Sequence, residues 1–345
     1  MLSIPSLEYS GDFRMQFLNS ILEVKNLKTY FYMRKGVARA VDDVSLTVNK
    51  SDVVGLVGES GCGKSVTALS ILKLVPDPPG KIKGGQIFFE KKDLLTLNEK
   101  EMRKIRGRKI SMIFQDPLTS LDPVAKIGDQ IVEAIRAHND ISSQKAWEKA
   151  IDTLAKVGIT DAEIRAKQYP FQLSGGMRQR VMIAIALVTE PSLLIADEPT
   201  TNLDVTIQAQ ILSLIKDIKT RANTSILFIT HNLGIVAWLC NVVYVMYAGK
   251  IVEYGLTKNM FKKPLHPYTQ LLLNAVPRLD IAKDTLQSIE GDVPDLVNPP
   301  SGCRFHPRCP YAKKICSEVE PNLIEAEDGQ YAACLIYDKE KWDKA

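Results

Sequence analysis

The feature that most constrains this chain is the glycine-rich stretch Gly58–Ser65, which has the form G-x-x-x-x-G-K-S. An apolar run, Val53–Val57, comes before it and predicts a buried strand. Thr67–Leu72 follows and predicts the start of a helix. Strand, glycine loop and helix form the context in which this motif binds a polyphosphate. A chance glycine-rich turn is the alternative, and the Lys-Ser pair argues against it.

Each part of the loop has an expected role. Glycines allow a tight backbone whose N–H groups point inward, and the helix N-terminus adds the positive end of its dipole. Lys64 would supply a charge to the β- and γ-phosphates, and the Ser65 hydroxyl would coordinate Mg²⁺. The residues expected to bind ATP here are Ser60, Gly61, Cys62, Gly63, Lys64, Ser65 and Val66.

Composition narrows the class of protein. The chain has 345 residues, which suggests two or three domains, and its 45% apolar and 24% charged residues are those of a soluble globular protein. A net charge of +4 gives no support for nucleic-acid binding. No apolar run approaches the ~20 residues needed to span a bilayer.

The N-terminal residues 1–20 predict a partly ordered leader rather than a signal peptide, because Asp12 and Arg14 interrupt the apolar residues. Met15 is a plausible alternative start. We therefore expect a cytosolic protein whose six cysteines are reduced or metal-bound rather than paired in disulfides.

Three more apolar runs end in polar side chains. Gln115 follows Ile110–Phe114, Asp197 and Glu198 follow Leu193–Ala196, and His231 follows Ser225–Thr230. If these strands are parallel, their carboxyl ends lie beside the phosphate-binding loop Gly58–Ser65, the P-loop, at one edge of a sheet. Asp197 would hold Mg²⁺ and Glu198 would polarise an attacking water. A solvated strand end and a structural histidine are the alternatives.

Other segments complete the expected layout. Ile21–Leu27 and Val41–Val48 predict two strands, separated by the aromatic cluster Thr29–Tyr32, which could pack across strands or stack on adenine. A basic helix is predicted over Asn98–Arg108. Residues 117–172 have helical spacing, chiefly in Val124–His138 and Ser143–Val157. Ser174, Gly175 and Gly176 at the next helix start could form a second anion cradle or only a loop.

Together, residues of about 21–260 resemble the nucleotide-binding domain of ABC transporters. The most specific segment is Leu173–Arg180, which resembles the ABC signature. The resemblance makes Gln115 the Q-loop residue and a Mg²⁺ ligand, Asp197 and Glu198 the Walker B pair, Leu203 and Asp204 the D-loop, and His231 the switch histidine. It also makes Phe31 the aromatic that stacks on adenine, with Tyr30 as the second choice.

Further segments resemble the oligopeptide/dipeptide importer branch, and most of all its D-type ATPase subunits. They are Ile113–Leu121, Glu198–Gln210, His266–Thr269 and Asn274–Pro277. Asn202 departs from that branch, where alanine is more usual.

The resemblance implies an ATPase in which two such subunits pack head to tail. Each ATP would lie between one P-loop and the Ser174–Gly176 cradle of the other subunit. Glu198 would be the general base, His231 would orient water and the γ-phosphate, and Gln115 would relay to the membrane subunits. The implied partners are a second, paralogous ATPase subunit, two transmembrane permease subunits and an extracytoplasmic substrate-binding protein, with no nucleic acid. The chain would sit at the cytoplasmic side of the membrane.

The predicted fold is α/β: a P-loop ABC-type core over 21–260, with an antiparallel β subdomain and a helical subdomain at about 117–175. A small irregular cysteine-rich domain would follow over 261–345. It holds four of the six cysteines, Cys303, Cys309, Cys316 and Cys334, separated by five, six and seventeen residues. Zinc sites use closer pairs, so we expect a 4Fe–4S cluster, with zinc or no metal as alternatives.

Two other functions remain open. A soluble ABC ATPase acting on DNA or ribosomes would predict long inserts, tandem cassettes or a strongly basic face. An importer of sugar or nickel would share these motifs, because the substrate is selected by other subunits.

Overall fold

The structure, a computed structural model, describes residues 19–201, 203–275 and 289–343. Most of the expected leader, the departure at Asn202 and the segment Val276–Pro277 lie outside these residues. Within the described ranges, no helix is both long and apolar enough to cross a bilayer.

A four-stranded antiparallel sheet opens the fold, in the order β2-β1-β4-β5. Its strands are β1 (Ser20–Met33), β2 (Gly36–Asn49), β4 (Gly80–Phe89) and β5 (Lys92–Asp93). The two predicted strands are confirmed, and the expected antiparallel sheet is present. β1 runs on through the aromatic cluster, because those residues pair with β2 on one side and β4 on the other.

The second sheet has eight strands in the order β11-β12-β10-β9-β3-β8-β7-β6. The strands β9, β3, β8, β7 and β6 are parallel, whereas the β10, β12 and β11 pairings are antiparallel. The bounds are β3 (Val53–Val57), β6 (Ile110–Ile113), β7 (Leu193–Asp197), β8 (Ser225–Thr230), β9 (Val242–Tyr247), β10 (Lys250–Leu256), β11 (Ile324–Glu327) and β12 (Gln330–Ala332).

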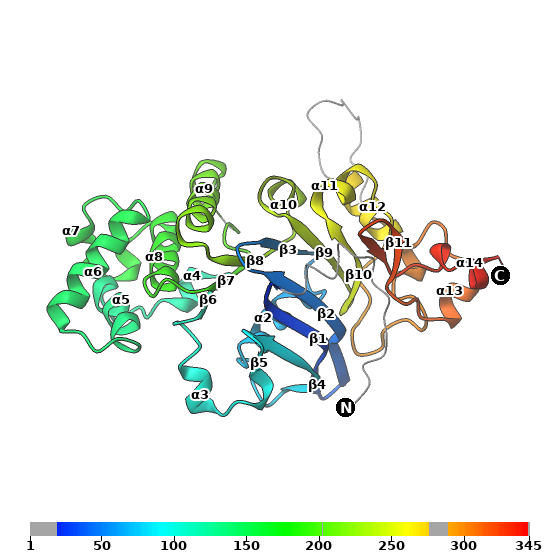
Figure 1. Ribbon diagram of the computed structural model, residues 1–345, viewed down its shortest axis with the longest axis horizontal. Helices are drawn as coiled ribbons and strands as arrows, with labels where there is room; N and C mark the ends of the chain where they lie inside the picture. Colours follow the sequence, from blue (N-terminus) through cyan, green and yellow to red (C-terminus); the bar gives the residue numbers. More distant parts are fainter. Residues whose placement is uncertain (1–18, 202, 276–288, 344–345) are drawn as a thin grey trace.

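The core fills both faces of the eight-stranded sheet. Along β3, Val54 and Leu56 pack into the cluster shared with the antiparallel sheet, whereas Val53 and Val57 pack into the cluster on the other face. Helix α2 (Lys64–Ile71) contributes to the first of these clusters and so lies against both sheets (Figure 1). Because side chains alternate along a strand, this packing fixes which strand-end residues face α2.

A helical lobe extends from one side of the sheets, drawn in cyan to green in Figure 1. It comprises α4 (Pro117–Ser120), α5 (Ile127–Arg136), α6 (Ser143–Lys156), α7 (Ala162–Ala166) and α8 (Gly175–Leu187). The two predicted helices correspond to α5 and α6. In α6, Ala146, Ala150 and Leu154 are buried at four-residue spacing, which explains the correct prediction.

The predicted basic helix is shorter than expected. α3 spans only Glu99–Arg103, capped by Asn98. The chain then turns, because Gly107 takes a φ of +74° and Arg106 donates to the carbonyl oxygen of Leu72. Within the described ranges, short 3-10 helices also occur at Leu94–Thr96, Pro170–Gln172, His306–Arg308 and Leu335–Tyr337.

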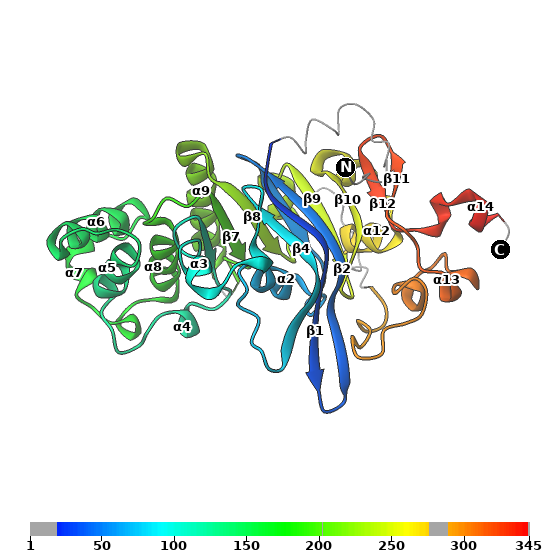
Figure 2. The same ribbon diagram turned by 60° about the horizontal axis from the view of Figure 1, so that its bottom comes forward.

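The C-terminal segment differs from the expected separate irregular domain. β12 pairs with β10 and continues the main sheet, and the Tyr254 and Tyr331 rings stack with centroids 4.6 Å apart. Phe305 belongs to the central core cluster. Figure 2 shows this segment against the β9–β10 side of the sheet. The remaining helices are α9 (Val205–Ala222), α10 (Leu233–Leu239), α11 (Thr257–Lys262), α12 (Pro267–Asn274), α13 (Ile315–Glu318) and α14 (Lys339–Trp342).

Candidate functional site

The glycine-rich loop joins β3 to α2 in a conformation that requires glycine. Gly63 has a φ of +111°, and a Cβ atom there would lie 2.1 Å from the carbonyl oxygen of Ala40. A Cβ atom on Gly58 would lie 2.1 Å from the carbonyl oxygen of Met246. Both contacts are far below van der Waals distance, so the backbone itself packs against the strands.

Lys64 lies inside this loop. Its side chain is buried, and its Nζ donates to the carbonyl oxygens of Gly58 at 2.8 Å and Glu59 at 2.9 Å. Helix α2 begins at Lys64, and no side chain caps its N-terminus. The cation and the helix N-terminus therefore point to the same loop, which is the arrangement that binds a polyphosphate.

Asp197 faces the start of α2. Leu193 and Ile195 of β7 pack on the α2 side of the sheet, and Asp197 continues that alternation. Burial raises the pKa of its carboxyl group, and a hydrogen bond with the Ser65 side chain partly opposes this rise. Its Oδ1 atom is buried without a hydrogen-bond partner. A buried carboxylate oxygen beside a hydroxyl fits Mg²⁺ coordination.

Glu198 is the centre of a polar cluster at the next position. Its backbone takes a φ of +46°, so its side chain leaves the strand direction. Oε2 accepts from Thr201 Oγ1 at 2.9 Å and from Gln115 Nε2 at 3.2 Å. Oε1 lies 3.2 Å from Nδ1 of His231, whose side chain is 59% exposed. The structure thus brings together the three predicted strand ends of β6, β7 and β8.

The signature residues belong to the helical lobe. Ser174 caps α8 by accepting from the Met177 N–H at 3.3 Å. A Cβ atom on Gly175 would meet nothing within 4 Å, so that position faces open space. Asp204 caps the neighbouring helix α9. None of the hydrogen bonds found in the described ranges joins Ser174–Gly176 to the P-loop of the same chain.

The aromatic cluster offers two candidates for adenine. The Tyr30 hydroxyl donates to Asp42 Oδ1 at 2.7 Å, so this ring is fixed by a polar contact. Phe31 is half-buried on β1, close to Gly80 after α2. Phe31 therefore stays the predicted stacking residue.

All four tail cysteines line one small pocket, together with His266, Phe305 and Trp342. Burial raises the pKa of the Cys303 thiol to about 11 and of the Cys334 thiol to about 12. Nowhere in the described part of the chain do three or more His, Cys, Asp or Glu side chains form a group that could hold a metal ion. The structure therefore does not support the expected cluster as a preformed metal site.

Sequence reasoning missed a second layer behind the P-loop. The Glu59 N–H donates to the Tyr268 hydroxyl, and the Glu59 carboxylate pairs with Arg308. These partners lie 209 and 249 residues away in the chain, and no local pattern indicates such contacts.

Comparison with known protein families gives two matches. Residues 41–201 match the ABC transporter family, and residues 252–316 match the family described as the oligopeptide/dipeptide transporter C-terminal region. The second match covers the first three tail cysteines.

Among solved structures, the dimeric ATP-binding cassette MJ0796, in a post-hydrolysis state with ADP and phosphate, is similar with a TM-score of 0.62 at 25% identity. That comparison covers 68% of this chain and 98% of the other. The structure of cbiO1 from Clostridium perfringens, part of a transporter complex, has a TM-score of 0.60 at 26% identity and covers 71% and 92%.

Whole-chain relatives extend the match. A probable peptide ABC transporter ATP-binding protein of Sinorhizobium fredii is 52% identical over 91% of this chain and 94% of its own. The oligopeptide transport ATP-binding protein AppD of Bacillus subtilis is 50% identical over 94% and 98%. The dipeptide transport ATP-binding protein DppD of the same organism is 48% identical over 93% and 96%. With the nucleotide site in place, these matches show that the chain belongs to the ABC transporter ATPases, in the oligopeptide/dipeptide transporter family.

Proposed function

We propose that this chain is the ATP-hydrolysing subunit that drives uptake of dipeptides or oligopeptides through partner membrane subunits. The observation that carries the proposal is the cluster of Gln115, Glu198 and His231 at the same sheet edge as the P-loop. The substrate class is that of the relatives similar over nearly the whole chain, which are named as peptide, oligopeptide and dipeptide transport ATP-binding proteins.

Each residue of the site has a proposed role in binding or hydrolysing ATP. Lys64 and the N–H groups of Ser60–Val66 bind the phosphates, while Phe31 stacks on adenine. Ser65, Asp197 and Gln115 would hold Mg²⁺, which would supply positive charge to offset that of the phosphates. Glu198 accepts a proton from the attacking water, and His231, 3.2 Å from Glu198, orients that water.

A second ATPase subunit completes the site, and we propose a paralogous partner. The open position at Gly175 supports this arrangement, because the signature cradle has no hydrogen bond to its own P-loop among the described residues. The two transmembrane permeases and the extracytoplasmic substrate-binding protein follow from the family. The chain would then lie at the cytoplasmic side of the membrane.

Isolation of the full chain tests this assignment. A tagged chain purified from detergent-solubilised membranes should bring down two polytopic membrane proteins and a related ATPase subunit, identified by mass spectrometry. Recovery with ribosomes or DNA, and without membrane proteins, would favour the soluble ABC ATPase instead. If this chain is the only ATPase subunit recovered with the membrane proteins, the partner is a second copy of the chain and the proposed paralogous partner is wrong.

We also propose a 4Fe–4S cluster at Cys303, Cys309, Cys316 and Cys334. The support is that the four thiols line one pocket although up to 17 residues separate neighbours in sequence. Four cysteine thiolates are the ligand set that a 4Fe–4S cluster would require, and they would hold it in this pocket. The described residues contain no preformed group for a metal ion, so the proposal rests on the shared pocket and the ligand count.

Metal analysis of the anaerobically purified chain tests the cluster. The expected result is about four irons and four sulfides per chain with a broad visible band. The variant Cys316→Ser should lose both. Zinc alone, or no metal under strict anaerobiosis, would overturn the cluster and leave the ATPase proposal intact.

A further inference from the structure

A loop of the C-terminal segment, residues 303–309, contacts the nucleotide site at two points. It carries two arginines whose side chains are only 7% and 6% exposed, Arg304 and Arg308. Each makes an ion pair with a carboxylate of the nucleotide-binding core. Buried arginines whose hydrogen bonds go to fixed partners hold local geometry more firmly than surface ion pairs do.

Arg308 forms an ion pair with a residue of the P-loop. Its two terminal nitrogens lie 2.8 and 3.1 Å from the two carboxylate oxygens of Glu59, a bidentate pair. Its Nε donates to the carbonyl oxygen of Glu290 at 2.9 Å, so the guanidinium is itself held in place. Glu59 is the second residue of the glycine-rich motif, and its carbonyl oxygen accepts from Lys64 Nζ. Glu59 therefore connects Arg308 to Lys64, the lysine that we expect to bind the phosphates.

Tyr268 of α12 holds the backbone of the same residue. Its hydroxyl accepts the Glu59 N–H at 2.9 Å. The ring packs against Tyr247 and Phe305, with centroids 4.6 and 5.4 Å away. This aromatic cluster links α12, β9 and the 303–309 loop directly behind the P-loop.

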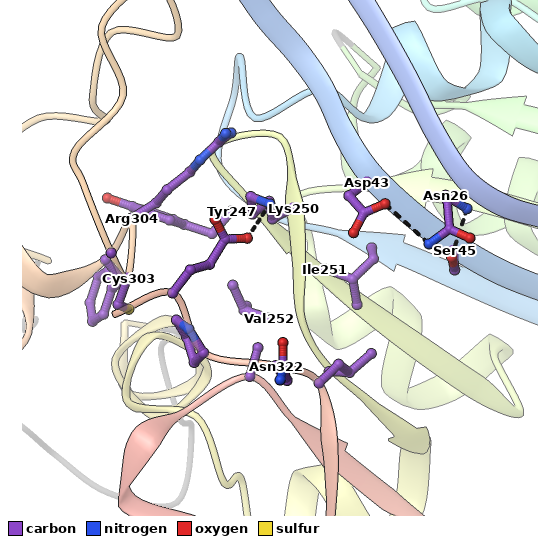
Figure 3. Close-up of a pocket in the computed structure, with 16 residues that line it drawn as sticks. Asn26, Asp43, Ser45, Tyr247, Lys250, Ile251, Val252, Cys303, Arg304 and Asn322 are labelled. Carbon is purple, nitrogen blue, oxygen red and sulfur yellow. Dashed lines mark hydrogen bonds and ion pairs between the residues drawn. The ribbon is translucent and has the colours of Figure 1, made fainter. Parts of the chain in front are cut away.

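Arg304 makes the second contact, with β2 and with the turn between β9 and β10. It forms an ion pair with Asp42 of β2 and donates to the carbonyl oxygen of Ala248. Asp42 also accepts from the Tyr30 hydroxyl, next to the proposed adenine residue. Figure 3 shows a pocket that both parts of the chain line. Cys303 and Arg304 come from the C-terminal segment, and Tyr247 and Lys250 come from the core.

We propose that Arg308 and Tyr268 are positioning residues for ATP binding, which hold Glu59 and with it the P-loop in its phosphate-binding conformation. Arg308 acts in a second way. It pairs with the only carboxylate within Gly58–Ser65, and an unpaired carboxylate in that loop would repel a polyphosphate. None of the hydrogen bonds found in the described ranges joins Arg308 or Tyr268 to Glu198, Gln115 or His231. The inference stands apart from the metal proposal, since no step uses the cysteines.

The test is steady-state ATPase kinetics of the assembled transporter, together with ATP binding to the purified full chain. Arg308→Gln should raise the KM for ATP and the ATP dissociation constant about ten-fold, which corresponds to ~1.4 kcal/mol. Its kcat should stay within about two-fold, because the chemistry at Glu198 is untouched. Arg308→Lys keeps the charge but loses the bidentate geometry, so it should recover part of the affinity.

A double-mutant cycle identifies Glu59 as the intermediary. If Arg308 acts through Glu59, the Glu59→Gln/Arg308→Gln double variant should raise KM less than the product of the two single effects. Independent, multiplying effects would contradict the proposal. Lys314→Gln is the matched control: it removes one charge from the same segment, at a side chain that is 90% exposed, and should leave KM unchanged.

The variant Tyr268→Phe tests the same proposal if Arg308→Gln does not fold. It removes only the hydroxyl, and we expect a KM increase of about three-fold with normal kcat, as the loss of one hydrogen bond predicts. An unchanged KM in folded Tyr268→Phe and Arg308→Lys would overturn the proposal. A fall in kcat at constant KM in these variants would also overturn it.

Discussion

At the scale of single residues, Glu198 has the features of a general base. Its side chain is 11% exposed, and three neighbours, Thr201, Gln115 and His231, fix both oxygens. Asp197, one residue earlier, faces Ser65 instead. The two adjacent carboxylates therefore contact different partners, because the strand alternates and the φ of +46° at Glu198 turns the chain.

The variant Glu198→Gln should keep ATP binding and lose turnover by roughly 10²–10⁴-fold, the usual contribution of a general base. The amide is of similar size, so the site should still close around ATP and trap a dimer. Steady-state hydrolysis and gel filtration with ATP measure the two effects. Lys64→Ala is the contrasting variant, expected to lose ATP affinity itself. Undiminished hydrolysis by Glu198→Gln would refute its role.

At the scale of elements, the parallel strands explain why so much of the site was predictable. The loop after β3 and the ends of β6, β7 and β8 are each marked by an apolar run followed by polar residues. Each signal is local, and the sheet alone brings them together. The helices α5 and α6 were predictable for the same reason, because their burial repeats at helical spacing.

The strand β10 carries a buried carboxylate that joins three elements. Glu253 is fully buried and accepts from the Leu265 and His266 N–H groups at 2.9 and 2.8 Å, and from Gln330 Nε2 at 2.8 Å. Removing the carboxylate leaves the two backbone N–H groups without an acceptor and leaves Gln330 Nε2 with only the Lys263 carbonyl oxygen. Glu253→Ala should therefore lower the free energy of unfolding by about 3 kcal/mol or more, measured by urea unfolding.

The same group predicts a pH dependence. Burial raises the pKa of Glu253 above its ordinary 4.5, and the hydrogen bonds only partly oppose this. A raised folded pKa means that the stabilisation is fully present below the unfolded pKa and is lost as pH rises through the folded pKa. The stability gap between the native chain and Glu253→Ala should therefore be larger at pH 5 than at pH 8. A gap that widens with pH would contradict this assignment.

At the scale of the whole molecule, the C-terminal segment is part of the nucleotide-binding core. Two strands extend the main sheet, and the 303–309 loop reaches the P-loop and β2. The sequence could not reveal this arrangement. The pairs Glu59–Arg308 and Asp42–Arg304 join residues 249 and 262 positions apart, and no local pattern predicts contacts over such separations. The cysteine spacing predicted a small irregular cysteine-rich domain, because the sequence carries no signal for its contacts with the core.

We propose that ATP hydrolysis at Glu198 drives peptide uptake. The most direct test reconstitutes the transporter that copurifies with this chain into liposomes and follows a labelled dipeptide. We predict uptake that requires ATP, stops with Glu198→Gln and is competed by unlabelled peptides but not by sugar or nickel. Uptake of sugar or nickel in place of peptides, or peptide uptake unaffected by Glu198→Gln, would contradict the account.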